Sequence, residues 1–193
     1  MKTARERFED NYMAISVPAD NKKGFKIEYV YYAPWHYWDL PKPELKRVKR
    51  VVALEMLAGI LLFALASGVD TGVNKTVSVL VPGAVCLCGM IFELLGVCQF
   101  FFSKYETTRT NMQDVTNKLM FATLVHLFAA AAASLLGALY MDRNGVHPLD
   151  VLCVSSYLLS GVAGVDIRRR YAGIPRREKA NDALDKYEPM TKE

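Results

Sequence analysis

The chain has 193 residues, with 24 Lys+Arg against 20 Asp+Glu, and 52% of its residues are hydrophobic. This length fits one ordinary domain. Four long apolar segments contain only four charged residues, Glu55, Glu93, Asp150 and Asp166. A surface helix of a soluble protein needs a polar face. Here the apolar and the charged residues occupy different segments of the chain, which excludes a soluble enzyme, a disordered chain and a disulfide-stapled secreted domain. The sequence predicts a small multi-pass membrane protein.

The N-terminal region, residues 1–42, is too short for an independent core. Its first twelve residues, MKTARERFEDNY, are charged and lack the apolar stretch of a secretory signal. We therefore expect the first span to act as its own insertion signal. Residues 25–32 alternate between apolar and polar side chains, which favours a short strand.

An aromatic segment follows, in which Trp35, Tyr37 and Trp38 stand just ahead of the basic run KRVKR. Amphipathic aromatic side chains favour the headgroup level of a bilayer. The composition therefore favours an interfacial segment that lies on the inner leaflet and anchors the chain. The alternative is a ligand or partner site formed by the aromatic cluster and His36.

Four segments are long and apolar enough to cross a membrane as helices, which takes roughly 20 residues. They are residues 51–69, 77–102, 119–140 and 149–167. The first continues a helix that begins near Pro43, and Pro148 marks the start of the fourth. The predicted fold is an all-α membrane protein in which residues 43–167 form a four-helix transmembrane bundle. Residues 168–193 are predicted to be a basic and then polar tail.

The basic residues predict the orientation of these spans. Residues 1–50 hold 11 Lys and Arg, residues 103–118 hold three, and the tail after Ile167 holds eight. With four spans these regions share one side, so 22 of the 24 basic residues lie together there. Both termini are therefore expected in the cytoplasm. The span pattern and the lack of sorting motifs favour the plasma membrane of a bacterium.

Ionisable residues within spans are the strongest functional pointers, because each costs roughly 2.5–3.5 kcal/mol to insert. Glu55, Glu93 and His126 are of this kind. At about 1.5 Å rise per residue, all three lie in the cytoplasmic half, at depths of roughly 7, 16 and 12 Å. They could therefore converge into one cluster that exchanges protons near neutral pH. In the alternative, Glu55 reaches towards Lys49 or Arg50, while Glu93 and His126 form one neutral hydrogen-bonded pair.

Small residues recur at four-residue spacing in the last two spans. The positions are Ala129, Ala133 and Gly137 in the third span, and Ser156, Ser160 and Gly164 in the fourth. Such stripes let a neighbouring helix approach closely. The two stripes are predicted either to pack against each other or to form a dimer contact.

The sequence carries no catalytic motif and no phosphate-binding loop, and it predicts no cofactor. Its four cysteines lie inside spans without the spacing of a metal site, so we expect them to pack as small apolar residues. The expected partners are the bilayer, its anionic inner-leaflet lipids, and a second copy or another membrane protein, but not nucleic acid. These features favour an accessory or assembly component of a membrane complex. The alternative is a proton-coupled transporter or channel-like oligomer that uses the buried Glu and His residues.

Overall fold

The computed structural model describes residues 10–20, 22 and 24–181, which fall into two compact units. The helical unit comprises residues 40–103 and 113–175. Among the described residues, the strand unit combines those from Asp10 to Asp39, residues 104–112 and those from Arg176 to Asn181. The predictions for the first nine residues and for the polar tail from residue 182 lie outside the described residues.

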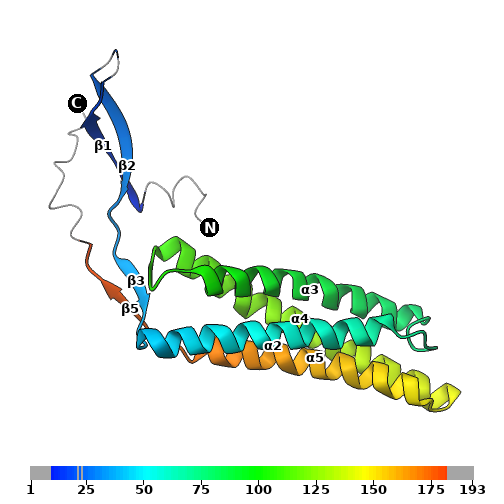
Figure 1. Cartoon of the computed structure of the whole chain (residues 1–193). Helices are drawn as coiled ribbons and strands as arrows, with labels where there is room; N and C mark the ends of the chain where they lie inside the picture. Colours follow the sequence, from blue (N-terminus) through cyan, green and yellow to red (C-terminus); the bar gives the residue numbers. More distant parts are fainter. Residues whose placement is uncertain (1–9, 21, 23, 182–193) are drawn as a thin grey trace. The chain divides into compact units, whose positions relative to one another are not determined.

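The helical unit contains four long helices, which can be followed in Figure 1. They are α2 (Lys42–Gly68), α3 (Val77–Phe102), α4 (Arg109–Asn144) and α5 (Pro148–Ala172). All four are long and apolar enough to cross a membrane, which confirms the prediction of four candidate spans. Three of the helices extend beyond the predicted apolar segments, because long basic side chains at a helix end can reach water while the backbone stays helical.

The four helices lie side by side, and each contacts at least two others. Helix α2 packs against α3 and α5. The Lys118 ammonium links α4 to α3 by donating to Gln99 Oε1 at 2.9 Å, and the Ser134 hydroxyl links α4 to α5 by donating to the Val154 carbonyl at 3.1 Å. The largest fully buried side chains of this unit are Phe100, Leu119, Ile167, Tyr171, His126 and Glu93.

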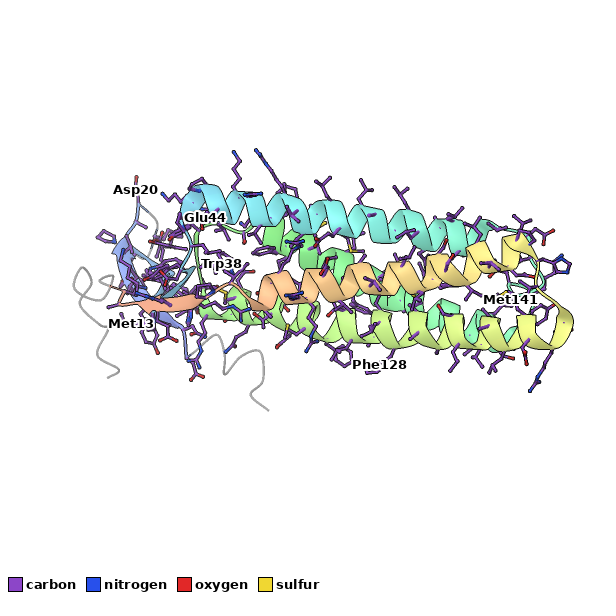
Figure 2. The ribbon with its side chains drawn as sticks, turned by 90° about the horizontal axis from the view of Figure 1, so that it is seen from below. Met13, Asp20, Trp38, Glu44, Phe128 and Met141 are labelled. Carbon is purple, nitrogen blue, oxygen red and sulfur yellow. The ribbon has the colours of Figure 1, made fainter. Side chains whose placement is uncertain are left out.

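The outer surface of the helical unit carries many large apolar side chains. Exposed side chains include Leu61 of α2, Phe92 of α3 and Leu159 of α5. Figure 2 shows Phe128 projecting from α4 away from the other helices, and this side chain is 68% exposed. Soluble proteins rarely expose such extensive apolar surfaces, whereas a lipid-facing helix requires them. The exposed apolar side chains and the lengths of the helices therefore both indicate a multi-pass membrane protein.

The strand unit contains a hairpin and a small sheet. Strands β1 (Tyr12–Pro18) and β2 (Phe25–Tyr31) pair antiparallel, and the turn between them includes Gly24 at a φ of +71°. Glycine adopts this left-handed conformation without steric cost. Strand β2 confirms the strand pattern predicted for residues 25–32.

The small sheet joins three distant parts of the chain. Strand β3 (Trp35–Trp38) lies between β4 (Glu106–Thr107) and β5 (Arg176–Lys179), and both pairings are antiparallel. The all-α prediction was therefore wrong outside the four helices. It missed β4 and β5 because strands of two and four residues carry no detectable hydrophobic period, so only their pairing with β3 defines them.

Candidate functional site

Three buried polar side chains from three helices form a continuous hydrogen-bonded network, which we call the Glu–His–Ser network. His126 of α4 lies between Glu93 of α3 and Ser160 of α5. Its Nδ1 is 2.7 Å from Glu93 Oε2, and its Nε2 is 3.0 Å from Ser160 Oγ. The Ser160 hydroxyl also donates to the carbonyl of Gly59 in α2 at 3.0 Å. The network therefore connects all four helices, and its three residues are at most 1% exposed.

Glycines create the space for this network. A Cβ atom on Gly89 would lie 2.9 Å from the backbone nitrogen of His126, closer than real Cβ contacts allow. A Cβ on Gly164 would lie 3.0 Å from His126 Nδ1 and 3.5 Å from both carboxylate oxygens of Glu93. Small residues of this kind let helix backbones approach in a membrane. Here they also leave the volume that the Glu93 and His126 side chains occupy.

The Ser160–Gly59 hydrogen bond favours one arrangement of protons in the network. Ser160 has one hydroxyl proton. When this proton is donated to Gly59, Ser160 Oγ accepts a hydrogen bond from the His126 tautomer that carries a proton on Nε2. On the other side of the ring, either Glu93 is protonated and donates to Nδ1, or Nδ1–H donates to a Glu93 carboxylate. Both arrangements contain the same protons and are neutral overall. Neutrality suits a buried site, because an unpaired charge there would be costly.

This arrangement favours proton storage over nucleophilic catalysis. The order Ser–His–Glu resembles a hydrolase triad, in which an unprotonated imidazole nitrogen accepts the serine proton. Here the Ser160 hydroxyl lies 3.0 Å from the Gly59 carbonyl, and when it donates its proton there it cannot donate to His126 Nε2. Glu93 Oε1 is buried and has no hydrogen-bond partner within the described part of the chain. The network thus holds one shared proton beside one unused acceptor atom.

Glu55 lies apart from this network. Its Oε1 is 2.5 Å from Arg170 Nε of α5, so its partner is neither Lys49 nor Arg50. The Lys49 ammonium instead donates to the backbone oxygen of Ser103 at 2.6 Å, at the C-terminal end of α3. The structure therefore brings Glu93 and His126 together without Glu55. Sequence spacing could not reveal the Arg170 contact, because α2 and α5 become neighbours only in the folded chain.

The aromatic residues predicted as membrane anchors lie in or beside β3. Trp38 is fully buried, so it has no surface to present to lipid headgroups. Tyr37 stacks on Tyr105 with the ring centroids 6.0 Å apart, and Trp35 contacts Tyr31 at 4.9 Å. The burial of Trp38 argues against an anchoring role for that residue, and the anchoring role of the half-buried Trp35 and Tyr37 stays a prediction. The composition of the segment alone could not distinguish a buried strand from an interfacial one.

The small-residue stripes are buried inside the helical unit. Ala129, Ala133, Gly137, Ser156, Ser160 and Gly164 are all buried. A Cβ on Gly137 would clash with Val154 of α5, and a Cβ on Gly161 would lie 3.0 Å from Ala130 of α4. The two stripes therefore serve contacts within the chain, and their burial leaves no surface for a dimer contact.

Sequence reasoning treated Ser160 only as a packing residue and overlooked Gly59 and Gly89. One signal could have identified Ser160. It lies eight residues before Arg168, and His126 lies eight residues after Lys118, so both have the same depth from a basic boundary. The Gly59 carbonyl gives no such signal, because a helix backbone oxygen becomes a partner only through tertiary packing.

The cysteines do not gather into a site. Cys86 and Cys153 are buried, whereas Cys88 and Cys98 are exposed on α3. The Cys153 thiol donates to the Ala66 carbonyl at 3.2 Å, which links α5 to α2. Over residues 10–20, 22 and 24–181, no group of three or more His, Cys, Asp or Glu side chains could hold a metal ion.

Comparison with known proteins gives no further assignment. Neither a protein-family model, nor a curated protein, nor a solved structure matches this chain.

Proposed function

We propose that this protein is an accessory component of a membrane complex, and that its strand unit binds a partner at the cytoplasmic face. The observation that carries this proposal is the sheet β4–β3–β5. Its strands precede α2, separate α3 from α4, and follow α5. Two candidate spans therefore separate each strand from the next, and hydrogen-bonded strands must lie on the same side of a membrane.

The charge pattern supports the cytoplasm as that side. At the ends of the spans opposite the sheet only Lys75 and Arg143 are basic, while the other 22 basic residues lie before, between or after the spans on the sheet side. Positively charged segments are retained in the cytoplasm during insertion. Three chain segments that would otherwise be separate loops and tails thus combine into one cytoplasmic unit.

The hairpin offers a surface for a partner. Phe25, Ile27 and Tyr29 alternate along β2 and therefore share one face, where they are 43%, 50% and 61% exposed. Their cross-strand neighbours on β1 are Pro18, Ser16 and Ala14, which are small or apolar. An apolar strand face of this kind is typical of a protein contact.

The test is extraction of the tagged chain from native membranes in mild detergent, followed by identification of stoichiometric partners and the mass of the complex. Ile27→Asp places a charge on the apolar face and is expected to abolish the partner. Lys26→Asp is the matched control, because residue 26 is exposed on the opposite face of the same strand. A complex that contains only this chain, or an equal loss of partner in both variants, would contradict the accessory role.

A second candidate function, proton-coupled transport, is favoured by the Glu–His–Ser network. Its shared proton and the free Glu93 Oε1 would allow one proton to be accepted as another is released, and such a concerted exchange keeps the buried site neutral. The network has no exposed atom that reaches water, so this function would require the helices to open. Alternating access of this kind is usual in transporters.

Reconstituted vesicles with a pH-sensitive dye inside test this candidate. Glu93→Gln and His126→Gln are expected to abolish proton flux driven by a pH gradient. Glu55→Gln is the control, since this acid is paired with Arg170 outside the network. Wild-type vesicles without flux above empty vesicles, or full flux in His126→Gln, would contradict transport.

A further inference from the structure

A cleft of about 460 Å³ lies between the start of α2 and the end of α5. Leu40 and Val48 line it on the α2 side, and Asp166, Arg169 and Arg170 line it on the α5 side. Its wall therefore combines apolar side chains with both signs of charge. All of these residues belong to the helical unit.

The three neighbouring arginines of α5 differ in their contacts. The Arg168 guanidinium donates to the Met120 carbonyl, and Arg170 is held by Glu55. Arg169 is exposed, and among the described residues its guanidinium has no hydrogen-bond or ion-pair partner. Asp166, one turn earlier in the same cleft, likewise has no partner within the described ranges. The cleft thus offers one free cation and one free anion.

The face of α5 that carries these two groups continues into an exposed apolar stripe. Leu158, Val162 and Val165 precede Asp166 and Arg169 at helical spacing, and they are 50%, 51% and 38% exposed. One helix face therefore runs from lipid-exposed aliphatic side chains to a polar cleft at the basic end of the span. A membrane phospholipid changes in the same order, from apolar acyl chains to a charged headgroup.

We propose that this cleft binds one phospholipid with an ethanolamine headgroup. Arg169 donates to the phosphate, and Asp166 accepts a hydrogen bond from the terminal ammonium. The acyl chains follow the stripe formed by Leu158, Val162 and Val165. A purely anionic headgroup would meet the Asp166 carboxylate without a compensating ammonium, so the cleft selects a zwitterionic lipid. This site is independent of the accessory function proposed above.

Mass spectrometry of the intact, detergent-solubilised protein tests the site. The probes are phosphatidylethanolamine, phosphatidylglycerol and inorganic phosphate. Arg169→Gln is expected to bind phosphatidylethanolamine roughly tenfold more weakly, as for loss of one hydrogen bond to a charged group. Arg143→Gln is the matched control, because Arg143 is another exposed arginine in the last turn of a helix. It should bind the lipid as the wild type does.

Asp166→Asn gives a second and opposite readout. It is expected to raise the binding of phosphatidylglycerol relative to phosphatidylethanolamine, and a misfolded variant could not produce this gain. Equal lipid binding by Arg169→Gln and Arg143→Gln would overturn the proposal. Displacement of the lipid by millimolar inorganic phosphate would also overturn it, because the cleft would then be a site for free phosphate.

Discussion

At the scale of single residues, the Glu–His–Ser network depends on the glycines beside it as much as on its own polar side chains. His126 can lie against α3 because residue 89 is glycine, and the contact there is with backbone, which cannot rotate away. The Glu93 and His126 side chains then fill the space beside Gly164. The same glycines therefore allow both the close packing of the helices and the hydrogen bonds of the network.

Gly89→Ala should destabilise the helical unit by about 1–3 kcal/mol, because the new methyl group forces α3 and α4 apart. Gly68→Ala is the control, since a Cβ there would have no neighbour within 4 Å. Thermal unfolding in detergent, followed by circular dichroism, compares the two variants. Equal midpoints for both would contradict the close approach of α3 to the His126 backbone.

The His36 side chain gives the strand unit a dependence on pH. Burial lowers its pKa below the ordinary value of 6.5, Arg109 acts in the same direction, and Glu178 opposes them. The unfolded chain therefore binds a proton more readily, so stability falls as the pH decreases from above 6.5 through the lowered pKa. The only two tryptophans, Trp35 and Trp38, flank His36 and report on β3 by fluorescence.

The expected result is a denaturation midpoint, measured by tryptophan fluorescence, that decreases between pH 7.5 and pH 5.5 in the wild type. In His36→Gln the decrease over the same range should be smaller, because the titrating group is absent. A midpoint with the same pH dependence in both proteins would assign the effect to other groups.

At the scale of elements, the end of α3 shows how one helix stabilises another. The Lys49 ammonium of α2 lies 2.6 Å from the Ser103 carbonyl and 5.3 Å from the centroid of the Phe100 ring. The last carbonyl groups of a helix have no partner within it and carry partial negative charge. The buried Lys49 ammonium therefore donates a hydrogen bond to the carbonyl at the end of α3 and offsets the partial negative charge there.

Lys49→Met should cost about 1–3 kcal/mol, because it keeps the aliphatic volume and leaves the Ser103 carbonyl without this charged donor. Lys46→Met is the control, since Lys46 lies one turn earlier on α2 and is exposed. The midpoint of thermal unfolding in detergent distinguishes them. A loss of stability as large in Lys46→Met would exclude the capping role.

At the scale of the whole molecule, the sheet β4–β3–β5 constrains the topology through connectivity alone. Three strands separated by pairs of candidate spans can join only on one side of a bilayer. Position 146 in the connection between α4 and α5 should therefore lie on the opposite side from position 26 in the hairpin. Both positions are exposed.

Labelling of intact cells with a membrane-impermeant thiol reagent tests this topology. Val146→Cys should react in intact cells, and Lys26→Cys should react only after permeabilisation. The unmodified chain gives the background, because its four cysteines lie within α3 and α5. Reaction of both variants from outside would contradict four crossings with a cytoplasmic sheet.

The sequence by itself determined the four helices, because about 20 apolar residues in a row have no alternative to a membrane-spanning or buried helix. It also singled out Glu93 and His126, since a charged or titratable group inside such a segment is costly wherever it faces. It predicted a single hydrogen-bonded Glu93–His126 pair as one of two alternatives. Only packing decided between them, by turning Glu55 towards Arg170.

Only the tertiary structure decided the partners supplied by other helices and the small sheet. Ser160 joins His126, and Gly59 accepts from Ser160, because four helices meet at one level. Strand β5 is entirely polar and exposed, so nothing in its sequence distinguishes it from a solvated tail. It is a strand because β3 lies beside it, and such pairing between distant segments leaves no local pattern in the sequence.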